Sequence, residues 1–578
     1  MLLSNKIRVS AAQFAVTENI SDNLDTCLHM IEKAAEFSPD ILVLPEFVNH
    51  IAWYRDRAHC FEVAVDLSGE FVSRISNMAR QIDCVIKFNV TLRRPEGKVT
   101  GTNILVDETG KIIGINDKQI LMGNENNFLE RASEITPIFP TTIGPVGMYA
   151  CMDGVIPEVA RALAVRNPLI LLNSLNSFAY DEANLHIPVR AAENKVFVVA
   201  ANKVGALVPP ALLETIAGKL GIAPFYLHGA GESQIVGPDG AALAKAPRKG
   251  DAVVYADIDL IQAQEKQRSD GTHIFSARRP EIYQALGAAP STSEPSVDLP
   301  EMVEAAVFQP AMRGPNAVDE LLEALLQLAS DIKLLVLPEL FHLPENISDD
   351  LPYAVTASDA LETRLMQALQ GLPPTFFLAY SIVQVVDGKY HHAGRLLDRT
   401  GVRLTQPQLH SCGRHAWVTA LGDRIETIDL PLGRFAMVVG GDTIFPESYR
   451  IAAIQRATIV ASPTHILETW ETTLGFPERA AENRINVVSA TFPSTAGTSG
   501  IYAVTDDFTL WTPWKNRPFD GKINVPEITQ ADDSPGITQA KIYPAATTNR
   551  MISHRTDVVD DRPWALAAPI IQTLSFTQ

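Results

Sequence analysis

Short apolar runs alternate with segments of helical periodicity along the first half of the chain. The strand-like runs are IRVSAAQF, DILVLPE, VGMYA, LILLNS and VFVVAAN. Helical patterns cover residues 21–37, with Ser21 and Asp22 as N-cap candidates, and residues 157–166, with Pro157 in the first turn. This alternation predicts a layered α/β domain whose sheets are covered by helices.

The pattern of the first half occurs again in the second half. RAAENKVFVVAAN at 190–202 matches RAAENRINVVSAT at 479–491, and the motif LVLPE occurs in both halves. CMDGVIPE matches GGDTIFPE, so that Gly440 takes the place of Cys151. Several matches in one order and at nearly constant spacing indicate a duplicated domain.

The boundary between the two copies falls in a segment rich in Pro, Ser and Ala. We therefore expect a first domain at 1–286, a linker at 287–301 and a second domain at 302–578. Both domains are expected to have the same α/β fold, since the repeated motifs occupy corresponding positions.

The overall composition limits the classes of partner. The chain has 578 residues, of which 46% are hydrophobic and 20% charged, as in folded globular proteins. A net charge of −19 argues against nucleic acid or an anionic membrane as partner, because phosphates would be repelled. No apolar run is long enough to span a membrane, and the N-terminal residues lack the apolar core of a signal peptide. Five scattered cysteines indicate a reduced, cytoplasmic protein.

Three reactive side chains follow strand-like runs of the first half. Glu46 follows DILVLP, Lys118 follows KIIGIND and Cys151 follows VGMYA. Because loops at the carboxyl ends of strands gather to form sites in α/β folds, we expect these side chains to meet. A thiol, a carboxylate and an ammonium together can carry out acyl transfer.

The motifs around these residues resemble those of a known family. LPEF, DKQIL and CMDGVIPE are similar to the three motif regions of the nitrilase superfamily, the carbon–nitrogen hydrolases, and RAAENKVFVVAANKVG, GESQIVGPDG and RRPEIY resemble later stretches. The resemblance extends from about residue 7 to 286, in the family's order. It implies an αββα sandwich with Glu46 as general base, Lys118 as oxyanion stabiliser and Cys151 as nucleophile.

The resemblance implies further parts of the site. The family often has a second catalytic glutamate, and Glu125 in GNENNF matches it. The backbone N–H of Met152 is implied as the other oxyanion donor. The implied product of the first step is a thioester on Cys151, released by a water molecule that Glu46 activates.

The residues after the nucleophile bear on the substrate. Cys151-Met152-Asp153 resembles the amidase-like form of the motif, whereas nitrilases of the family usually have Cys-Trp-Glu. Several N-carbamoyl amino acid amidases have arginines just after the cysteine, where this chain has Gly154. We therefore expect an amidase acting on a small amide, with an N-carbamoyl amidase or a nitrilase as alternatives.

Other residues are candidates for the substrate pocket. Trp53 and Tyr54 lie just past Glu46, and Asn173 lies at the end of LILLNS. Residues 210–220 place Leu212, Leu213, Ile216 and Leu220 on one helical face, which predicts a short helix that either covers the pocket or packs on the surface.

The second half has lost the chemistry that the first half retains. Glu339 in VLPEL keeps the base, but Gly440 replaces the nucleophile, and the constant spacing of 289 residues puts Pro407 at the position of Lys118. The same spacing puts Arg414 at the position of Glu125, while Cys412 is a remote candidate for a replacement thiol. The second domain is thus expected to be non-catalytic, packed with the first as an internal pseudo-dimer that could assemble further.

Two readings of a different class stay open. One is an acyltransferase whose thioester is taken by an amine, and the other is a regulator without catalysis, against which the intact Glu46, Lys118 and Cys151 argue. No HExxH motif and no Cys/His cluster at metal spacing occurs, so we expect no metal or other cofactor.

Overall fold

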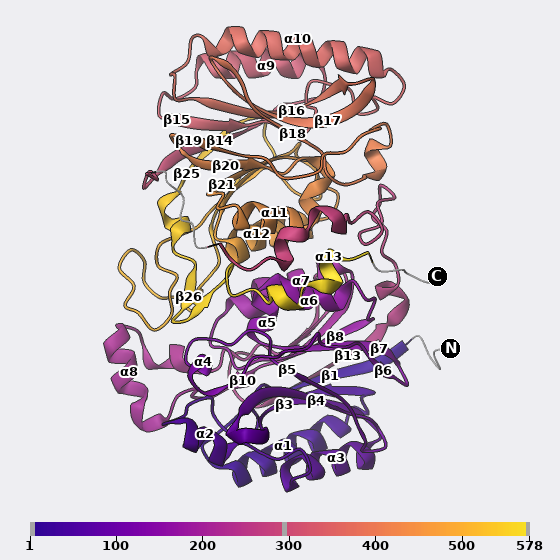
Figure 1. Ribbon diagram of the computed structural model, residues 1–578, viewed down its shortest axis with the longest axis vertical. Coiled ribbons are helices and arrows are strands. Elements are labelled where there is room, and N and C mark those ends of the chain that lie inside the picture. Colours follow the sequence, from indigo (N-terminus) through magenta and orange to yellow (C-terminus); the bar gives the residue numbers. More distant parts are fainter. Residues whose placement is uncertain (1–5, 292–297, 574–578) are drawn as a thin grey trace. The chain divides into compact units, whose positions relative to one another are not determined.

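The protein consists of two compact units, seen in a computed structural model that describes residues 6–291 and 298–573 (Figure 1). The first unit comprises Met1–Glu265, Asp507–Asn524 and Met551–Gln578, and the second comprises Lys266–Asp506 and Val525–Arg550. The compact units therefore do not end where the repeats end. The repeat boundaries at 286 and 302 stay a prediction, and part of the predicted linker, 292–297, lies outside the described residues.

The first unit contains two stacked sheets. One has the order β10-β1-β2-β3-β4-β5, with β13 antiparallel to β1. Its strands are β1 (Lys6–Ala15), β2 (Ile41–Val43), β3 (Val85–Arg93), β4 (Val99–Val106), β5 (Ile112–Asp117), β10 (Lys203–Val204) and β13 (Ala252–Asp259). The central strands β1, β2 and β3 are parallel, so their carboxyl ends lie on one edge.

The second sheet has the order β12-β11-β9-β8-β7-β6. Its strands are β6 (Phe139–Thr141), β7 (Gly144–Ala150), β8 (Ile170–Ser174), β9 (Phe197–Ala201), β11 (Gln234–Val236) and β12 (Ala242–Lys245). The inner faces of the two sheets form one apolar core, in which Val9 and Val43 of the first sheet meet Met148 and Leu172 of the second.

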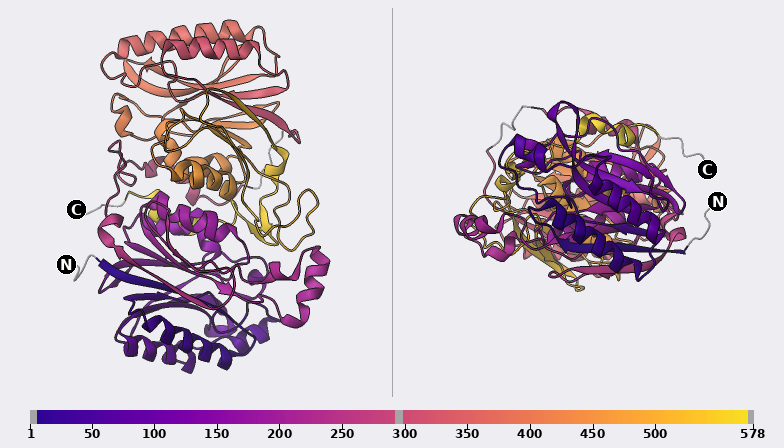
Figure 2. Two further views of the ribbon diagram at one scale, coloured as in Figure 1. Left: turned by 180° about the vertical axis from the view of Figure 1, so that it is seen from behind. Right: turned by 90° about the horizontal axis from the view of Figure 1, so that it is seen from below.

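Helices cover the outer faces of these sheets (Figures 1 and 2), which confirms the predicted sandwich. α1 (Ile20–Ala35) and α3 (Glu70–Ile82) pack on the first sheet, and α6 (Pro157–Ala164) and α7 (Ile187–Asn194) on the second. Shorter helices are α2 (Arg57–Val63), α4 (Glu125–Phe128), α5 (Met152–Val155) and α8 (Leu213–Leu220). The predicted N-caps of α1, Ser21 and Asp22, were wrong: the cap is Asn19, whose side chain accepts from the Ser21 and Asp22 N–H groups.

The second unit repeats the same layers. Its sheets have the orders β18-β17-β16-β15-β14-β25 and β19-β20-β21-β22-β23-β24. The first comprises β14 (Val303–Gln309), β15 (Ile332–Val336), β16 (Phe377–Val386), β17 (Lys389–Asp398), β18 (Gly401–Pro407) and β25 (Gly536–Ile542). The second comprises β19 (Thr427–Leu430), β20 (Gly433–Met437), β21 (Ile459–Pro463), β22 (Asn486–Ala490), β23 (Gly500–Ala503) and β24 (Glu527–Gln530). The helices are α9 (Pro315–Leu326) and α10 (Leu351–Leu369) on the first sheet and α11 (Pro446–Ile454) and α12 (Phe476–Asn483) on the second.

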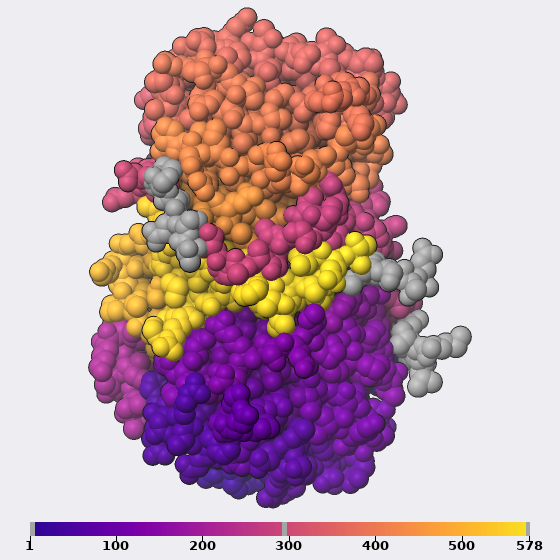
Figure 3. Space-filling view, in the orientation of Figure 1, coloured from indigo at the N-terminus to yellow at the C-terminus, as the bar shows by residue number. Residues whose placement is uncertain are grey.

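Late segments of the chain complete the first unit. The carboxylate of Asp181 accepts hydrogen bonds from the backbone N–H of Ile523, at 2.9 Å, and of Asn524. The Gly123 N–H donates to Thr556 Oγ1, in the hairpin of β26 (Met551–Ser553) and β27 (Thr556–Asp557). The terminal helix α13 (Ala568–Ile571) contacts α6, and these C-terminal residues, yellow in Figure 3, lie against the purple surface of the first half.

Two further expectations concern the whole chain. Within the part of the chain that the structure describes, no helix has the length and apolar character needed to cross a membrane. The internal pseudo-dimer stays a prediction.

Candidate active site

The edge of the first unit's sheets carries the three predicted catalytic side chains at strand ends. Glu46 lies three residues beyond β2, Lys118 directly follows β5 and Cys151 directly follows β7. The Glu46 and Lys118 side chains are completely buried, and Cys151 is partly exposed. The sheet order brings β2 and β5 into one sheet and β7 into the facing one, so the predicted residues come from both layers.

Lys118 joins two carboxylates. Its Nζ lies 2.6 Å from Glu46 Oε1 and 2.7 Å from Glu125 Oε2. The Met122 N–H also donates to Glu125 Oε2, at 3.0 Å, which fixes that carboxylate at the start of α4. Burial alone would lower the pKa of Lys118, but Glu125 and Glu46 raise it well above its usual range. Lys118 is therefore a permanent cation in contact with both carboxylates.

Cys151 sits on a strained turn. Its φ of 50° and ψ of −110° fall in the region that favours glycine, and such strain is typical of functional positions. The Cys151 N–H bonds to the Ser174 carbonyl oxygen at 2.9 Å and to Asn173 Oδ1 at 3.1 Å, which holds the turn. Met152 follows as the first residue of α5, where a backbone N–H has no intrahelical acceptor.

The surroundings of Cys151 favour the protonated thiol. Burial, together with the charges of Glu46 and Glu182, raises the pKa of Cys151 well above its usual range, while Lys118 opposes this shift. Because the thiolate is the nucleophilic form, the site needs a base that takes the proton as the reaction begins. Glu46, the predicted base, interacts electrostatically with Cys151, as does Glu182.

Asp153 is a part of the site that the sequence analysis did not interpret. Its Oδ1 accepts from the backbone N–H groups of Gln119, at 3.1 Å, and Ile120, at 2.9 Å. It thus ties the residue after Lys118 to the nucleophile turn, and burial raises its pKa to about 7. The signal was present in the sequence, because this Asp is one of the residues shared by CMDGVIPE and GGDTIFPE.

Lys203 was also missed. It lies in β10, its side chain is 1% exposed, and it interacts electrostatically with Glu46 and Cys151. Burial lowers the pKa of Lys203 to about 7. The sequence offered only a lysine after a buried strand, a pattern too common to single it out.

The three predicted pocket residues take different positions. Tyr54 is buried beside Phe128 at a ring distance of 5.4 Å and interacts electrostatically with Glu125. Trp53 packs on the apolar cluster under α8. Asn173 lies behind Cys151, where its side-chain oxygen accepts the Cys151 N–H, so this residue orients the nucleophile turn.

The helix predicted at 210–220 is present as α8. Leu213, Ile216 and Leu220 pack with Ala217 and the residues beneath, as the pattern predicts. Leu212 precedes the helix and is 38% exposed, so it does not share the apolar face.

The second unit has the same turn without the thiol. Gly440 has a φ of 58°, and Asp442 accepts from the N–H groups of Leu409 and His410, both at 2.8 Å, as Asp153 does in the first unit. The position of Lys118 was predicted one residue too early. Gln408, not Pro407, occupies it: the Gln408 N–H bonds to the His392 carbonyl oxygen as the Lys118 N–H bonds to that of Gly101.

The retained glutamate of the second unit is paired with an arginine. Arg414 donates to Glu339 Oε1 at 3.2 Å and to Oε2 at 2.9 Å, and His415 Nε2 lies 2.8 Å from Oε1. Burial alone would raise the pKa of Glu339, but Arg414 and His415 hold it well below its usual range. Cys412 Sγ lies 3.2 Å from Arg414 Nη1 and 3.4 Å from Asp270 Oδ2, and burial raises its pKa to about 11.

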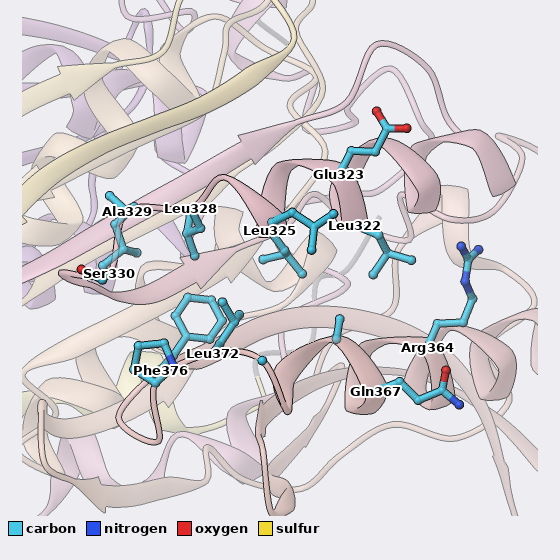
Figure 4. Close-up of a pocket in the computed structure, with 15 residues that line it drawn as sticks. Leu322, Glu323, Leu325, Leu328, Ala329, Ser330, Arg364, Gln367, Leu372 and Phe376 are labelled. Carbon is cyan, nitrogen blue, oxygen red and sulfur yellow. The ribbon is translucent and has the colours of Figure 1, made fainter.

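The described part of the second unit contains a smaller cavity and a larger one. One of about 220 Å³ is lined by Glu339 and Arg414. Another of about 1000 Å³ lies between α9 and α10 and is lined largely by apolar side chains such as Leu325 and Phe376 (Figure 4). Among the residues with a described position, no cluster of three or more His, Cys, Asp or Glu could hold a metal ion.

Comparison with known proteins agrees with the geometry of the first unit. The carbon–nitrogen hydrolase family model matches residues 8–268. This stretch is a carbon–nitrogen hydrolase domain. The match covers the strand ends that carry Glu46, Lys118 and Cys151, and it confirms the resemblance drawn from the motifs.

The names of relatives of the carbon–nitrogen hydrolase domain describe several activities. N-carbamoylputrescine amidase of Solanum lycopersicum is 25% identical over 48% of this chain and 94% of its own length. The nitrilase of Pyrococcus abyssi is 28% identical over 44% of this chain and 90% of its own. Deaminated glutathione amidase of Mus musculus is 25% identical over 48% of this chain and 85% of its own length.

Solved structures similar to this chain also cover about half of it. The C. elegans NitFhit protein is 21% identical over 48% of this chain and 66% of its own, with a TM-score of 0.42. A mutant of the Nesterenkonia AN1 amidase, from the nitrilase superfamily, is 20% identical over 48% of this chain and 96% of its own, with a TM-score of 0.40.

Proposed function

We propose that the first unit is a thiol amidase that hydrolyses a small non-peptide amide through a thioester on Cys151. The observation that carries the proposal is the array in which Lys118 contacts Glu46 and Glu125 beside the strained Cys151 turn. A carbon–nitrogen hydrolase needs a nucleophile, a proton carrier and a cation for the oxyanion, and this array supplies all three.

In the proposed first step, Glu46 takes the proton of the Cys151 thiol as the sulfur attacks the amide carbon. The C–S bond forms, and the carbonyl oxygen becomes an oxyanion between the Lys118 ammonium and the Met152 N–H. Glu46 then returns the proton to the nitrogen as the C–N bond breaks, so ammonia or an amine leaves and a thioester remains.

In the second step Glu46 removes a proton from water, which attacks the thioester carbon. The collapse of this intermediate breaks the C–S bond, returns the proton to sulfur and releases the carboxylic acid. Glu125 keeps Lys118 in place throughout, because it shares the ammonium with Glu46 at 2.7 Å. Glu125 is thus proposed as a residue that orients the oxyanion stabiliser.

An N-carbamoyl amidase is the second candidate, favoured by the relatives named N-carbamoylputrescine amidase. The same steps on an N-carbamoyl amine give a carbamoyl thioester and then carbon dioxide, with ammonia and an amine as the nitrogen products. A nitrilase activity is a further alternative, because a relative of Pyrococcus abyssi has that name.

We also propose that the second unit has no hydrolase activity. Gly440 supplies no nucleophile, Gln408 no cation, and the Glu339 carboxylate is already bound by Arg414 and His415. A base held as a tightly paired anion is a poor proton acceptor, because its pKa is held low.

The test is a panel of amides, N-carbamoyl amines and nitriles, with ammonia release followed and the intact chain weighed by mass spectrometry. Amide turnover with an acyl adduct on Cys151 is expected. Cys151→Ala should lower kcat by about 10⁶-fold, and Lys118→Met by at least about 10²–10³-fold. A matched control is Cys60→Ala, a buried thiol of α2 outside the array, which should retain turnover. Turnover that persists in Cys151→Ala would remove this residue as the nucleophile.

A further inference from the structure

The cavity of about 220 Å³ in the second unit lies where the first unit carries its array. Its lining includes Arg313, Glu339, Glu345, Arg414 and His465. Glu339 follows β15 as Glu46 follows β2, and the residue after each has a positive φ, 46° at Leu340 and 48° at Phe47. The second unit has therefore kept the framework of the site and a hollow beside it.

In the second unit, other side chains fill the space that a nucleophilic side chain at residue 440 would need. A Cβ placed on Gly440 would lie 2.7 Å from His392 Cε1 and 3.0 Å from Glu339 Oε2. The His392 ring is fully buried, and its Nδ1 lies 2.8 Å from Gln408 Oε1. This side of the site is packed shut, so the remaining cavity suits binding without covalent chemistry.

Arg313 gives this cavity its chemical character. Its Nη1 donates to the Glu339 carbonyl oxygen at 3.2 Å, its Nη2 lies 3.1 Å from His465 Nδ1, and its guanidinium stacks 4.2 Å from the Phe492 ring centre. Within the described part of the chain, no carboxylate lies within ion-pair distance of this guanidinium. By contrast, Arg414 pairs with both Glu339 and Asp270.

An arginine in this environment can bind the carboxylate of a ligand. Its guanidinium remains charged at any working pH, and its planar fork matches the two oxygens of a carboxylate. Burial disfavours the Arg313 charge, and Glu339 and Glu345 favour it without forming an ion pair, so an anion that contacts the guanidinium would stabilise this charge further. The stacking on Phe492 fixes the plane of the fork.

The charges around Arg313 limit the charge of the ligand, and the cavity volume limits its size. Asp270, Glu339 and Glu345 also line the cavity; Arg414 pairs with Asp270 and Glu339, and His415 pairs with Glu339. This acidic surrounding disfavours a phosphate or another multiply charged anion. The volume is below the roughly 300–1,000 Å³ of drug-sized sites, so the ligand has few carbon atoms.

We propose that the second unit is a binding site for a small monocarboxylate, whose carboxylate pairs with Arg313 in the cavity beside Glu339. The site is reversible and non-covalent. It does not depend on the proposed amidase reaction, because none of its residues takes part in the array around Cys151.

Isothermal titration calorimetry of the full chain tests this, with sodium butyrate as the probe and sodium phosphate and n-butanol as comparisons. Butyrate should bind more tightly than either. Arg313→Gln should weaken the butyrate site at least about tenfold, equivalent to about 1.4 kcal/mol, and Arg313→Lys should weaken it less because the charge remains. Arg364→Gln is the matched control, because this arginine pairs with Asp319 on the surface of α9 and α10, and it should leave binding unchanged.

Glu345→Gln provides a variant that does not disturb the buried residues. Glu345 is exposed at the cavity and acts electrostatically on Arg313, so its neutralisation should strengthen butyrate binding by about threefold. Glu345→Gln keeps the stacking of Arg313, and Arg313→Lys keeps the positive charge. These two variants therefore test the carboxylate site even if Arg313→Gln does not fold. Equal affinity in wild type and folded Arg313 variants, tighter binding of phosphate, or no butyrate binding at about 10 mM would each overturn the proposal. Each result is independent of ammonia release by the first unit.

Discussion

Placing a thiol in the second unit is the sharpest test of the proposal that this unit has no hydrolase activity. The variant is Gly440→Cys in a Cys151→Ala background, so that any turnover comes from the new thiol. A Cβ at residue 440 would lie 2.7 Å from His392 Cε1, closer than real Cβ contacts allow, and 3.0 Å from Glu339 Oε2, which is a tight contact. Either the His392 ring or the turn itself must therefore move.

The cost follows from two features of the turn. Overpacking of a well-filled interior costs about 1–3 kcal/mol, and a non-glycine residue at a φ of 58° adds about 1–2 kcal/mol. We expect Gly440→Cys to lower the stability of the second unit by about 2–5 kcal/mol. His392→Gly, which copies Gly101 of the first unit, should remove the steric part, so the double variant should be more stable than the sum of the single effects.

The assay is urea unfolding of the full chain, followed by circular dichroism and fitted with separate transitions for the two units. Ammonia release is measured on the same samples. Neither the single nor the double variant should exceed the rate of Cys151→Ala, because Gln408 supplies no cation and Arg414 holds Glu339 as an anion. A Gly440→Cys chain within about 0.5 kcal/mol of its parent would refute the steric argument, and recovered turnover would refute the electrostatic one.

Three further predictions concern the first unit. Lys203→Met should stabilise the protein at neutral pH: the wild-type lysine has a pKa of about 7 when folded and 10.5 when unfolded, so its charge penalises the fold below pH 7 and the penalty fades as the pH rises toward 10.5. The stability gain of the variant, at roughly 1.4 kcal/mol per pKa unit, should therefore shrink in urea titrations between pH 7 and 10, and a gain constant with pH would contradict this. Methyl methanethiosulfonate should modify Cys151 at a rate that still increases above pH 9, because burial raises the pKa of its thiol, and a plateau near pH 7 would show that the thiolate forms earlier. Asp181→Ala should release the segment 507–524, because the hydrogen bonds to this charged group are lost at a cost of about 1.5–3 kcal/mol of stability. Limited proteolysis with mass spectrometry should detect cleavage in that segment. Asp83→Ala, which changes an exposed helix end, is the control and should leave the segment uncleaved.

Local patterns were sufficient to predict the layers and the strand ends that carry Glu46, Lys118 and Cys151. Buried strands can be recognised from their runs of apolar residues. The residues that follow such a strand are then known from the sequence, so the positions of these three side chains at strand ends could be predicted directly. Glu125 needed the family resemblance, because a carboxylate in a polar loop has no pattern of its own. Its contact with Lys118 became visible only in three dimensions.

The errors arose where contacts, not periodicity, decide the structure. A constant spacing assigned Pro407 to the place of Lys118, but the hydrogen bonds place Gln408 there, because loop lengths differ between the repeats. Asp153 has its effect through backbone groups over 30 residues earlier in the chain, and no local window contains both partners. The cap at Asn19 was missed because the helical pattern begins after it.

The return of residues 507–524 and 551–573 to the first unit affects how the protein is made. A ribosome adds about 5–20 residues per second, so roughly 15–60 s separate the emergence of residue 265 from that of the last of these segments. Asp181 lacks Ile523 and Asn524 for nearly all of that interval. The first unit of the nascent chain therefore lacks these two segments until translation of the second unit is almost finished.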